Sequence, residues 1–308
     1  MTTKTAVLWD SEVNWEGEEP FVDETFNSSY EYFSESAEKE GGEVYIAKYS
    51  WWSSGLEKAF VYRNGGWRKV KDVEIDVVFD KYRFDEETVK LKKQLEKEIP
   101  VLNPFDLEKL CKDKLLTYES FPDYVAETYE ADESSVEGIL EKGKAVLKPR
   151  YDFGGKGVEV IDSLKDYDFE EGVLVQKFVD STHGIPSLGV KGVHDLRVIV
   201  MDGEPLVSYI RQPESGLISN VHRGGSMKNV ELEKVPAEVF DMVEEVDEHL
   251  ERYSDRLYSI DFIFDENETP WILELNSKPG LGFYSDDRIA SWKKPLIDRA
   301  AKKLVQMG

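Results

Sequence analysis

Cysteine and long apolar runs are scarce in this sequence of 308 residues. The one cysteine, Cys111, cannot form an internal disulfide or a cysteine-based zinc site, which is typical of a reducing compartment. The apolar run near the N-terminus is short, Ala6–Trp9, and no later stretch approaches the roughly 18 apolar residues of a membrane span. We therefore expect a soluble, cytoplasmic protein.

Positive charge is also in short supply. The chain has 39 Lys and Arg against 63 Asp and Glu, a formal net charge of −24. Such a surface repels phosphate backbones and anionic lipid headgroups, so we expect neither a nucleic acid nor a membrane as partner. The four histidines show no metal-ligand spacing, and none accompanies a Ser or Cys nucleophile motif. An anionic ligand would need locally gathered Lys and Arg side chains.

The first hundred residues alternate strand and helix patterns, which predicts an α/β lobe. The expected elements are strands at 6–9, 44–47 and 75–79, a helix at 24–40, and a hairpin of 60–63 with 67–70. No G-x-G-x-x-G follows the first strand, so nothing indicates a dinucleotide fold. Asn103-Pro104 suggests a boundary, with helices predicted at 106–118 and 237–252. The predicted domains are 1–100, 101–180 and 181–308.

A glycine-rich loop lies between two apolar strands, 145–149 and 158–161. It carries Arg150, Gly154, Gly155, Lys156 and Gly157. Backbone N–H groups of such a loop can approach an anion closely while a lysine neutralises it, although the loop is not a Walker A motif. A plain glycine-rich hairpin explains the pattern about equally well. Lys148 favours the anion site, because a lysine pointing inward from an apolar strand needs an anionic partner.

Further polar groups follow on the next strands. The strand 172–180 could offer its backbone to an adenine edge, with Asp180 near a ribose, but any connecting strand looks the same. Arg197, Arg211 and Arg223 are suited to bidentate contacts with phosphate or carboxylate. For each arginine alone, a surface salt bridge in this acidic protein is the simpler interpretation.

The strands 259–264 and 271–276 form a predicted hairpin. Symmetric closure places Phe264 opposite Trp271 and Asp261 opposite Glu274, with Cβ atoms about 5 Å apart. This like-charge pair is destabilising unless a cation lies between the carboxylates, and Asn276 points the same way. Three oxygen ligands without Cys or His suit Mg²⁺. An exposed acidic face is the alternative, but the apolar residues of both strands favour a buried metal site.

Taken together, these motifs resemble the ATP-grasp superfamily. The resemblance rests on Asp261…Glu274-Leu275-Asn276 before Ser277-Lys278-Pro279-Gly280, on the strand lysine with its glycine loop, and on their order. The run Gln176-x-Phe178-Val179…Asp195-x-Arg197-Val198…Arg211…Asn220…Gly224-Gly225 is similar to glutathione synthetases and to ligases that add glutamate to ribosomal protein S6. The similarity covers about residues 101–290. It implies an α/β ATP-grasp fold: a pre-ATP-grasp lobe at 1–100, a small lobe with the glycine loop at 101–180, and a metal-binding lobe at 181–308.

The resemblance also implies residue roles. Arg197, Arg211 and Lys148 would be catalytic, the arginines lying near the γ-phosphate and the acyl phosphate. ATP would be bound by Lys114, Lys148, Gly154, Gly155, Lys156, Gly157, Gln176, Lys177, Phe178, Val179 and Asp180. Lys177 replaces an acid found in many relatives, which leaves the ribose contact open. Asp261, Glu274 and Asn276 would hold one or two Mg²⁺ ions, for which Mn²⁺ could substitute. Asn220 and Arg223 would contact substrate, and the long connection 181–193 would form part of the acceptor site.

The activity implied is an ATP-dependent carboxylate–amine ligase acting through an acyl phosphate and releasing ADP and phosphate. Its substrates would be a carboxylate and an amine of small molecules or peptides, and such relatives are often dimers or tetramers. Two alternatives stay open: a small-molecule kinase with the same nucleotide site, and a nucleotide-binding module without turnover.

Overall fold

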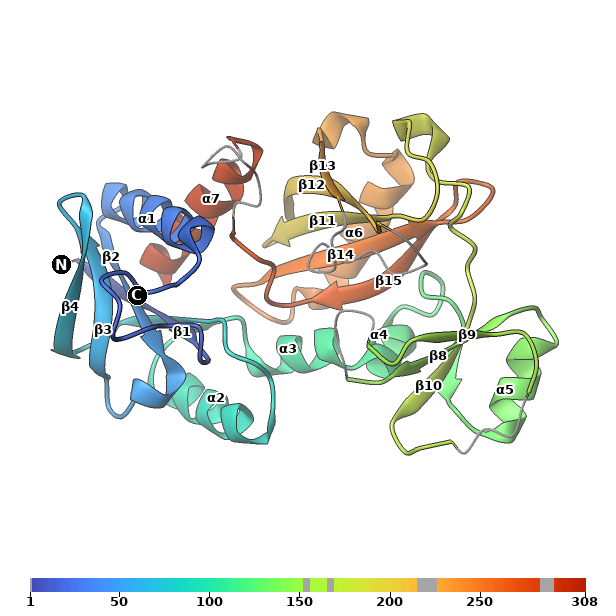
Figure 1. Ribbon diagram of the computed structural model, residues 1–308, viewed down its shortest axis with the longest axis horizontal. Helices are drawn as coiled ribbons and strands as arrows, with labels where there is room; N and C mark the ends of the chain where they lie inside the picture. Colours follow the sequence, from blue (N-terminus) through green and yellow to red (C-terminus); the bar gives the residue numbers. More distant parts are fainter. Residues whose placement is uncertain (1, 152–155, 165–168, 215–225, 283–290) are drawn as a thin grey trace. The chain divides into compact units, whose positions relative to one another are not determined.

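The computed structural model describes residues 2–151, 156–164, 169–214, 226–282 and 291–308 (Figure 1). The chain divides into two compact units. The first contains residues 1–105, 253–257 and 278–308, and the second contains residues 106–252 and 258–277. The division into domains at residues 100 and 180 stays a prediction. No helix in the described part of the chain combines the length and apolarity needed to cross a membrane.

A six-stranded sheet forms the centre of the first unit, in the order β4-β3-β2-β1-β5-β6. Its strands are β1 (Thr3–Trp9), β2 (Gly42–Lys48), β3 (Leu56–Arg63), β4 (Gly66–Val73), β5 (Val77–Asp80) and β6 (Val101–Leu102). The predicted hairpin is confirmed as β3–β4: Asn64 and Gly65 in its turn both have positive φ, as a type I′ turn requires. The strands expected at 6–9, 44–47 and 75–79 are confirmed as β1, β2 and β5.

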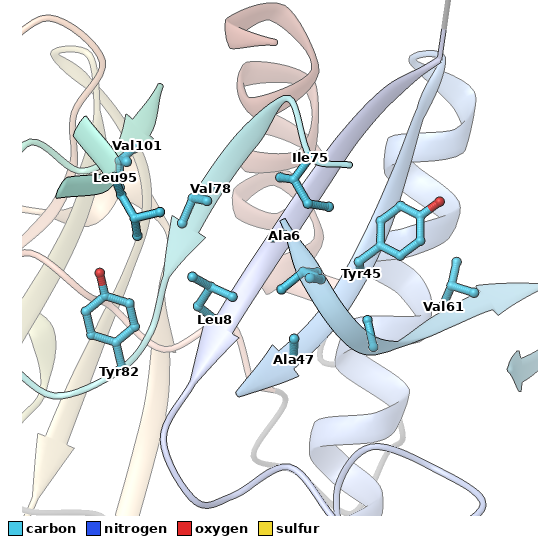
Figure 2. Close-up of a cluster of buried hydrophobic side chains, with 12 residues drawn as sticks. Ala6, Leu8, Tyr45, Ala47, Val61, Ile75, Val78, Tyr82, Leu95 and Val101 are labelled. Atoms are coloured by element: carbon cyan, nitrogen blue, oxygen red, sulfur yellow. The ribbon is translucent and has the colours of Figure 1, made fainter. Parts of the chain in front are cut away.

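Helices cover both faces of this sheet. They are α1 (Glu24–Lys39), α2 (Glu86–Glu98) and α7 (Lys294–Met307). The helices α1 and α7 lie side by side on one face (Figure 1), where the rings of Phe33 and Phe79 are 6.3 Å apart. Leu95 of α2 packs on the other face, in a cluster that Figure 2 shows with Ala6 and Leu8 of β1. The expected helix at 24–40 is confirmed as α1.

A buried ion cluster lies where β5 ends. The Asp80 Oδ2 atom accepts hydrogen bonds from Lys92 Nζ at 2.9 Å and Lys278 Nζ at 2.8 Å, and Asp80 and Lys92 are each 1% exposed. Burial alone raises the pKa of Asp80, but the charges of Lys278 and Lys92 outweigh it and lower the pKa below its ordinary value. The carboxylate is therefore a strong stabiliser of the first unit as long as it is ionised.

We expect Asp80→Asn to lower the free energy of unfolding by about 3–5 kcal/mol at pH 7, because two ammonium groups then face a neutral amide. A lowered pKa means that this stability is present above the ordinary Asp pKa of about 3.9 and is lost as pH falls below it. The gap between wild type and variant in urea unfolding should therefore narrow between pH 5 and pH 3. Asp76→Asn is the control, since Asp76 accepts one exposed backbone N–H bond. A gap that stays constant with pH would contradict the assignment.

The second unit begins with two short helices, where the sequence predicted one helix at 106–118. These are α3 (Phe105–Lys112) and α4 (Lys114–Ser120). The prediction of a continuous helix was wrong because Asp113 breaks it: its side chain accepts the backbone N–H groups of Leu115 and Leu116 and caps α4.

A four-stranded antiparallel sheet follows, in the order β7-β10-β8-β9. Its elements are β7 (Thr128–Glu130), β8 (Ala145–Pro149), β9 (Glu159–Ile161) and β10 (Val173–Lys177), with α5 (Glu133–Leu140) packed against it. Val136 and Ile139 of α5 share a core with Ala145, Leu147 and Val175. The predicted strands on either side of the glycine loop are thus confirmed as the paired strands β8 and β9.

The second unit also contains a five-stranded sheet in the order β13-β12-β11-β14-β15. Its strands are β11 (Asp195–Met201), β12 (Glu204–Gln212), β13 (Ser226–Val230), β14 (Leu257–Phe264) and β15 (Pro270–Asn276). The helix α6 (Ala237–Leu250) lies between β13 and β14 in the sequence. The predicted helix at 237–252 is confirmed as α6, which buries Val239, Val243, Val246 and Leu250. The Ile272 N–H group donates to Tyr124 O at 2.8 Å and so links β15 to the segment before β7. Short 3₁₀ helices occur at Tyr49–Trp51, Pro186–Leu188, Leu232–Lys234 and Ser291–Lys293.

Candidate active site

The hairpin β14–β15 places Asp261 directly opposite Glu274, as predicted. The predicted pairing of Phe264 with Trp271 was wrong, because Phe264 faces Pro270 and Ile263 faces Trp271. The register shifts between Asp261 and Phe262, so that Leu273 is the extra residue of a β-bulge. The shorter turn and the bulge offset each other, and the carboxylates therefore still meet.

Asp261, Glu274 and Asn276 share one face of the sheet. The Asn276 Nδ2 atom lies 3.4 Å from Asp261 Oδ2 and 3.3 Å from Glu274 Oε1. Asp261 is fully buried, whereas the Glu274 side chain is 25% exposed. The predicted convergence of the three side chains is confirmed, and the alternative of an exposed acidic face was wrong for Asp261.

Two guanidinium groups hold Asp261. Arg197 is bidentate, with Nε 2.5 Å from Oδ1 and Nη2 2.6 Å from Oδ2, and Arg211 Nη2 lies 2.6 Å from Oδ2. The Nε atom of Arg211 donates to Asp195 Oδ1 at 2.6 Å. The arginine side chains are only 12% and 14% exposed, so these are buried contacts and the simpler interpretation as surface salt bridges was wrong.

The carboxylates differ in electrostatic environment. Burial raises the pKa of Asp261, but Arg197 and Arg211 outweigh it and hold that pKa well below its ordinary value. Burial and then the charge of Asp261 raise the pKa of Glu274. Burial likewise raises the pKa of Asp195 to about 7, since removal from water outweighs the attraction of Arg211. Ionising Glu274 beside Asp261 is therefore unfavourable without a further cation.

The hairpin residues fit a hard divalent cation. Among the residues described, no three His, Cys, Asp or Glu side chains gather into a metal cluster, and this trio instead combines two carboxylates with an amide. Within the described ranges, the shortest ion-pair distance of Glu274 is 4.0 Å, from its Oε1 atom to Arg197 Nη2. The Asp261 Oδ1 atom accepts a hydrogen bond from Arg197 Nε and keeps a second lone pair. A cation there would offset the like-charge contact of Asp261 and Glu274.

A second polar cluster lies on the four-stranded sheet. Lys148 of β8 is 6% exposed, and its Nζ donates to Gln176 Oε1 of β10 at 2.8 Å. The Gln176 Nε2 atom donates to Thr128 Oγ1 at 2.7 Å and to Ala126 O at 3.2 Å. Within the described ranges no carboxylate forms an ion pair with Lys148, so a buried ammonium group has only a neutral amide as partner.

This environment lowers the pKa of Lys148 to about 7. Burial is the main cause, the nearby charge of Lys114 adds to it, and Glu274 opposes it. Lys114 is the first residue of α4, and its N–H group donates to Arg150 O at 3.3 Å. The charge of Lys114 therefore lowers the pKa of both Lys148 and Glu274, whereas the charge of Glu274 opposes the lowering at Lys148.

The glycine loop is described in part. Gly154 and Gly155 lie outside the described residues, whereas Lys156 is exposed and Gly157 has φ +66°. A Cβ atom on Gly157 would lie 2.9 Å from Pro149 Cγ, so both conformation and space require glycine there. Asn220 and Arg223 also lie outside the described residues.

The end of β10 and the residues that follow it have some of their backbone groups in hydrogen bonds. The N–H groups of Lys177 and Phe178 donate to Glu127 O and Lys144 O at 2.9 and 3.0 Å. The remaining backbone groups, such as the Val179 N–H, are those that an adenine edge could use. Asp180 accepts hydrogen bonds from the N and Oγ1 atoms of Thr182, which compete with a ribose contact.

The connection 181–193 is anchored within the second unit. Ser187 N donates to Glu268 Oε2 at 3.2 Å, and Gln212 Nε2 donates to Lys191 O at 2.7 Å. Ile185 and Val190 are buried and bridge one another. The connection is therefore a loop that is fixed by hydrogen bonds to β12 and to the β14–β15 turn.

The position of Asp195 in the site and the ion pair of Asp113 with Arg150 were not predicted from the sequence. Arg150 Nε and Nη2 each lie 2.7 Å from an oxygen of Asp113, the residue that caps α4 before Lys114. Asp195 was visible only as the first residue of the Asp-x-Arg motif. Its role depends on Arg211, which lies directly opposite on β12.

Known proteins share both the domain and the fold. Residues 113–267, half of the chain, match the family described as prokaryotic glutathione synthetase, ATP-grasp domain. No curated protein matches the chain. The VanG D-Ala:D-Ser ligase from Enterococcus faecalis aligns with a TM-score of 0.64 at 14% identity, over 100% of this chain and 99% of that one.

Two more solved structures have the same fold. D-alanyl-alanine synthetase A from Vibrio cholerae aligns with a TM-score of 0.61 at 16% identity, over 100% and 98% of the two chains. The macrocyclase MdnC from Microcystis aeruginosa, bound with precursor peptide MdnA, aligns with a TM-score of 0.61 at 12% identity, over 98% and 99%. These likenesses confirm the predicted α/β ATP-grasp fold. With half of its length matched, the chain belongs to the prokaryotic glutathione synthetase ATP-grasp family.

Proposed function

We propose that the protein is an ATP-dependent carboxylate–amine ligase whose site lies in the second unit. The family is one of ATP-grasp ligases, which use ATP and divalent metal ions. The observation that carries the proposal is the hairpin pair Asp261 and Glu274, two carboxylates held opposite each other with an amide beside them and guanidinium groups behind. Such a pair is costly unless it binds a cation.

Glu274, Asn276 and Asp261 would hold one or two Mg²⁺ ions. When bound, the metal would neutralise charge on the nucleotide phosphates and orient them. Lys148 and Lys114 would add positive charge for the phosphates from the four-stranded sheet and α4. Gln176 would hold Lys148 through its side-chain oxygen, and its Nε2 contacts with Thr128 and Ala126 would keep that oxygen in place.

Arg197 and Arg211 would bind the phosphoryl group that is transferred. The Nη1 atoms of both arginines have no hydrogen bond to any described residue, whereas their other donors are fixed on Asp261 and Asp195. A guanidinium group held on one side presents its remaining N–H groups in a fixed direction. This arrangement suits stabilisation of charge that develops on a phosphoryl group.

The reaction would proceed in two steps. A substrate carboxylate oxygen attacks the γ-phosphorus, the bond from phosphorus to the ADP oxygen breaks, and an acyl phosphate forms. The amine nitrogen then attacks the acyl carbon, phosphate leaves, and the amine loses a proton. Positioning and charge neutralisation supply the catalysis, so no general base is assigned. The acid and amine would belong to small molecules or peptides, the two kinds of substrate named for the structural neighbours.

Hydroxylamine trapping tests this function. With MgATP and a panel of carboxylic acids, amino acids and peptides, we expect ADP release that depends on the acid and yields a hydroxamate when hydroxylamine replaces the amine. A stable phosphorylated product without hydroxamate would instead identify a small-molecule kinase. Nucleotide binding by calorimetry without turnover on the whole panel would identify a binding module.

A further inference from the structure

One buried carboxylate of the second unit contacts neither the metal nor the nucleotide in the function proposed above. Asp195 begins β11, is 1% exposed, and lies directly opposite Arg211 on the antiparallel strand β12. Its Oδ1 atom accepts the Nε–H group of Arg211 at 2.6 Å. Asp195 itself is neither one of the three hairpin residues nor bonded to them.

The order of the strands explains why Arg211 needs support. In the order β12-β11-β14, the strand that carries Arg211 and the strand that carries Asp261 are separated by β11. Neighbouring strands are about 4.8 Å apart, so the Arg211 side chain must extend across β11 to place Nη2 on Asp261 Oδ2 at 2.6 Å. A long side chain with several rotatable bonds reaches that distance in many conformations.

The contact with Asp195 restricts the conformational freedom of the Arg211 side chain next to its guanidinium group. The Asp195 carboxylate fixes the Nε edge of the guanidinium, and Asp261 fixes Nη2, so the plane of the group is determined by two carboxylates on different strands. The remaining Nη1 group then has a defined direction, with no partner among the residues that the structure describes. Arg197, two residues along β11, lies on the same face, and its guanidinium is fixed by both oxygens of Asp261.

We propose that Asp195 is a positioning residue of the ligase, which acts through Arg211 by fixing the guanidinium for the phosphoryl group in transfer. The proposal rests on the function given above. It predicts a selective effect: Asp195 should matter for a ligand that mimics the transferred phosphoryl group, and little for nucleotide that lacks it.

Binding measurements test this without knowledge of the acid or amine. The probes are MgADP alone and MgADP with aluminium fluoride, which mimics a phosphoryl group between donor and acceptor. In wild-type protein, aluminium fluoride should tighten MgADP binding. In Asp195→Asn, we expect the affinity for MgADP alone to stay unchanged within error, while the gain from aluminium fluoride falls by about 10- to 100-fold. Asp247→Asn is the control, because Asp247 is a buried carboxylate of the same unit that accepts a hydrogen bond from Tyr258 and contacts neither arginine in the structure described.

A double-mutant cycle identifies the route of the effect. If Asp195 acts through Arg211, Asp195→Asn should cost little once Arg211→Gln is present. The proposal would be overturned if the two substitutions reduced the gain in affinity from aluminium fluoride additively, within about twofold. It would also be overturned if Asp195→Asn weakened the binding of both probes equally or left the gain from aluminium fluoride unchanged. If Asp195→Asn does not fold, Asp195→Glu provides the same test, because it keeps the charge but displaces the carboxylate by one methylene. Wild-type protein without MgADP binding would refute the ligase function itself, a result distinct from failure of the role of Asp195.

Discussion

Replacing Glu274 with glutamine is expected to remove ligase turnover and at the same time to stabilise the metal-free protein. Turnover should fall by at least about 100-fold, because an amide is a weaker ligand for a hard cation and carries no charge. The metal-free protein should become more stable because the pKa of Glu274 is raised by burial and by the charge of Asp261. Removing that repulsion at pH 7 should raise the melting temperature by about 2–4 °C per kcal/mol gained.

Differential scanning fluorimetry with and without Mg²⁺ and ADP separates these effects. Wild-type protein should show a rise in melting temperature on addition of Mg²⁺ and ADP that Glu274→Gln lacks. Glu266→Gln is the matched control, since Glu266 lies exposed in the turn of the same hairpin. Substrate-dependent turnover that survives in Glu274→Gln, or a metal-free variant less stable than wild type, would contradict the metal assignment.

The hairpin shows how far local sequence determines a site. Apolar runs on both sides of a connection rich in turn residues predicted both strands, and counting from the turn predicted that Asp261 meets Glu274. The count was right only because two deviations offset each other: the turn pairs Phe264 with Pro270, and the bulge at Leu273 restores the register. A bulge depends on how a strand bends against its neighbours, so the sequence pattern alone does not reveal it.

The guanidinium contacts could not be predicted in the same way. Asp195 and Arg211 belong to consecutive strands, but Asp261 comes about fifty residues later, and its proximity to Arg197 follows from the order β12-β11-β14-β15. No local pattern encodes that order, which depends on how whole strands pack. The split between α3 and α4 had a local signal, because Asp113 precedes a helical turn as an N-cap residue does.

Nucleotide binding is expected to be accompanied by the uptake of a proton, and Lys148 is expected to be the group that takes it up and makes the binding affinity depend on pH. In the ligand-free protein the pKa of Lys148 is lowered to about 7, mainly by burial and then by Lys114, so at pH 8 the amine is mostly neutral. Nucleotide phosphates beside it would favour the charged form and raise that pKa. Binding at pH 8 is therefore expected to take up close to one proton, and affinity for MgADP should fall by up to about tenfold per pH unit above pH 7.

Calorimetry at pH 8 in two buffers of different ionisation enthalpy measures this proton directly. In Lys148→Met the uptake should vanish and the affinity should become nearly independent of pH between 7.5 and 9. Lys142→Met is the control, because Lys142 is an exposed lysine that pairs with Glu127. The unliganded protein gives an independent check. Above pH 7 the Lys148 side chain binds more protons in the unfolded chain than in the folded one, because its pKa is lowered on folding. Its contribution to the free energy of unfolding should therefore rise with pH by up to about 1.4 kcal/mol per unit, and this slope should be absent from Lys148→Met. Proton uptake that persists in Lys148→Met would assign it to another group and leave Lys148 without a role in binding phosphate.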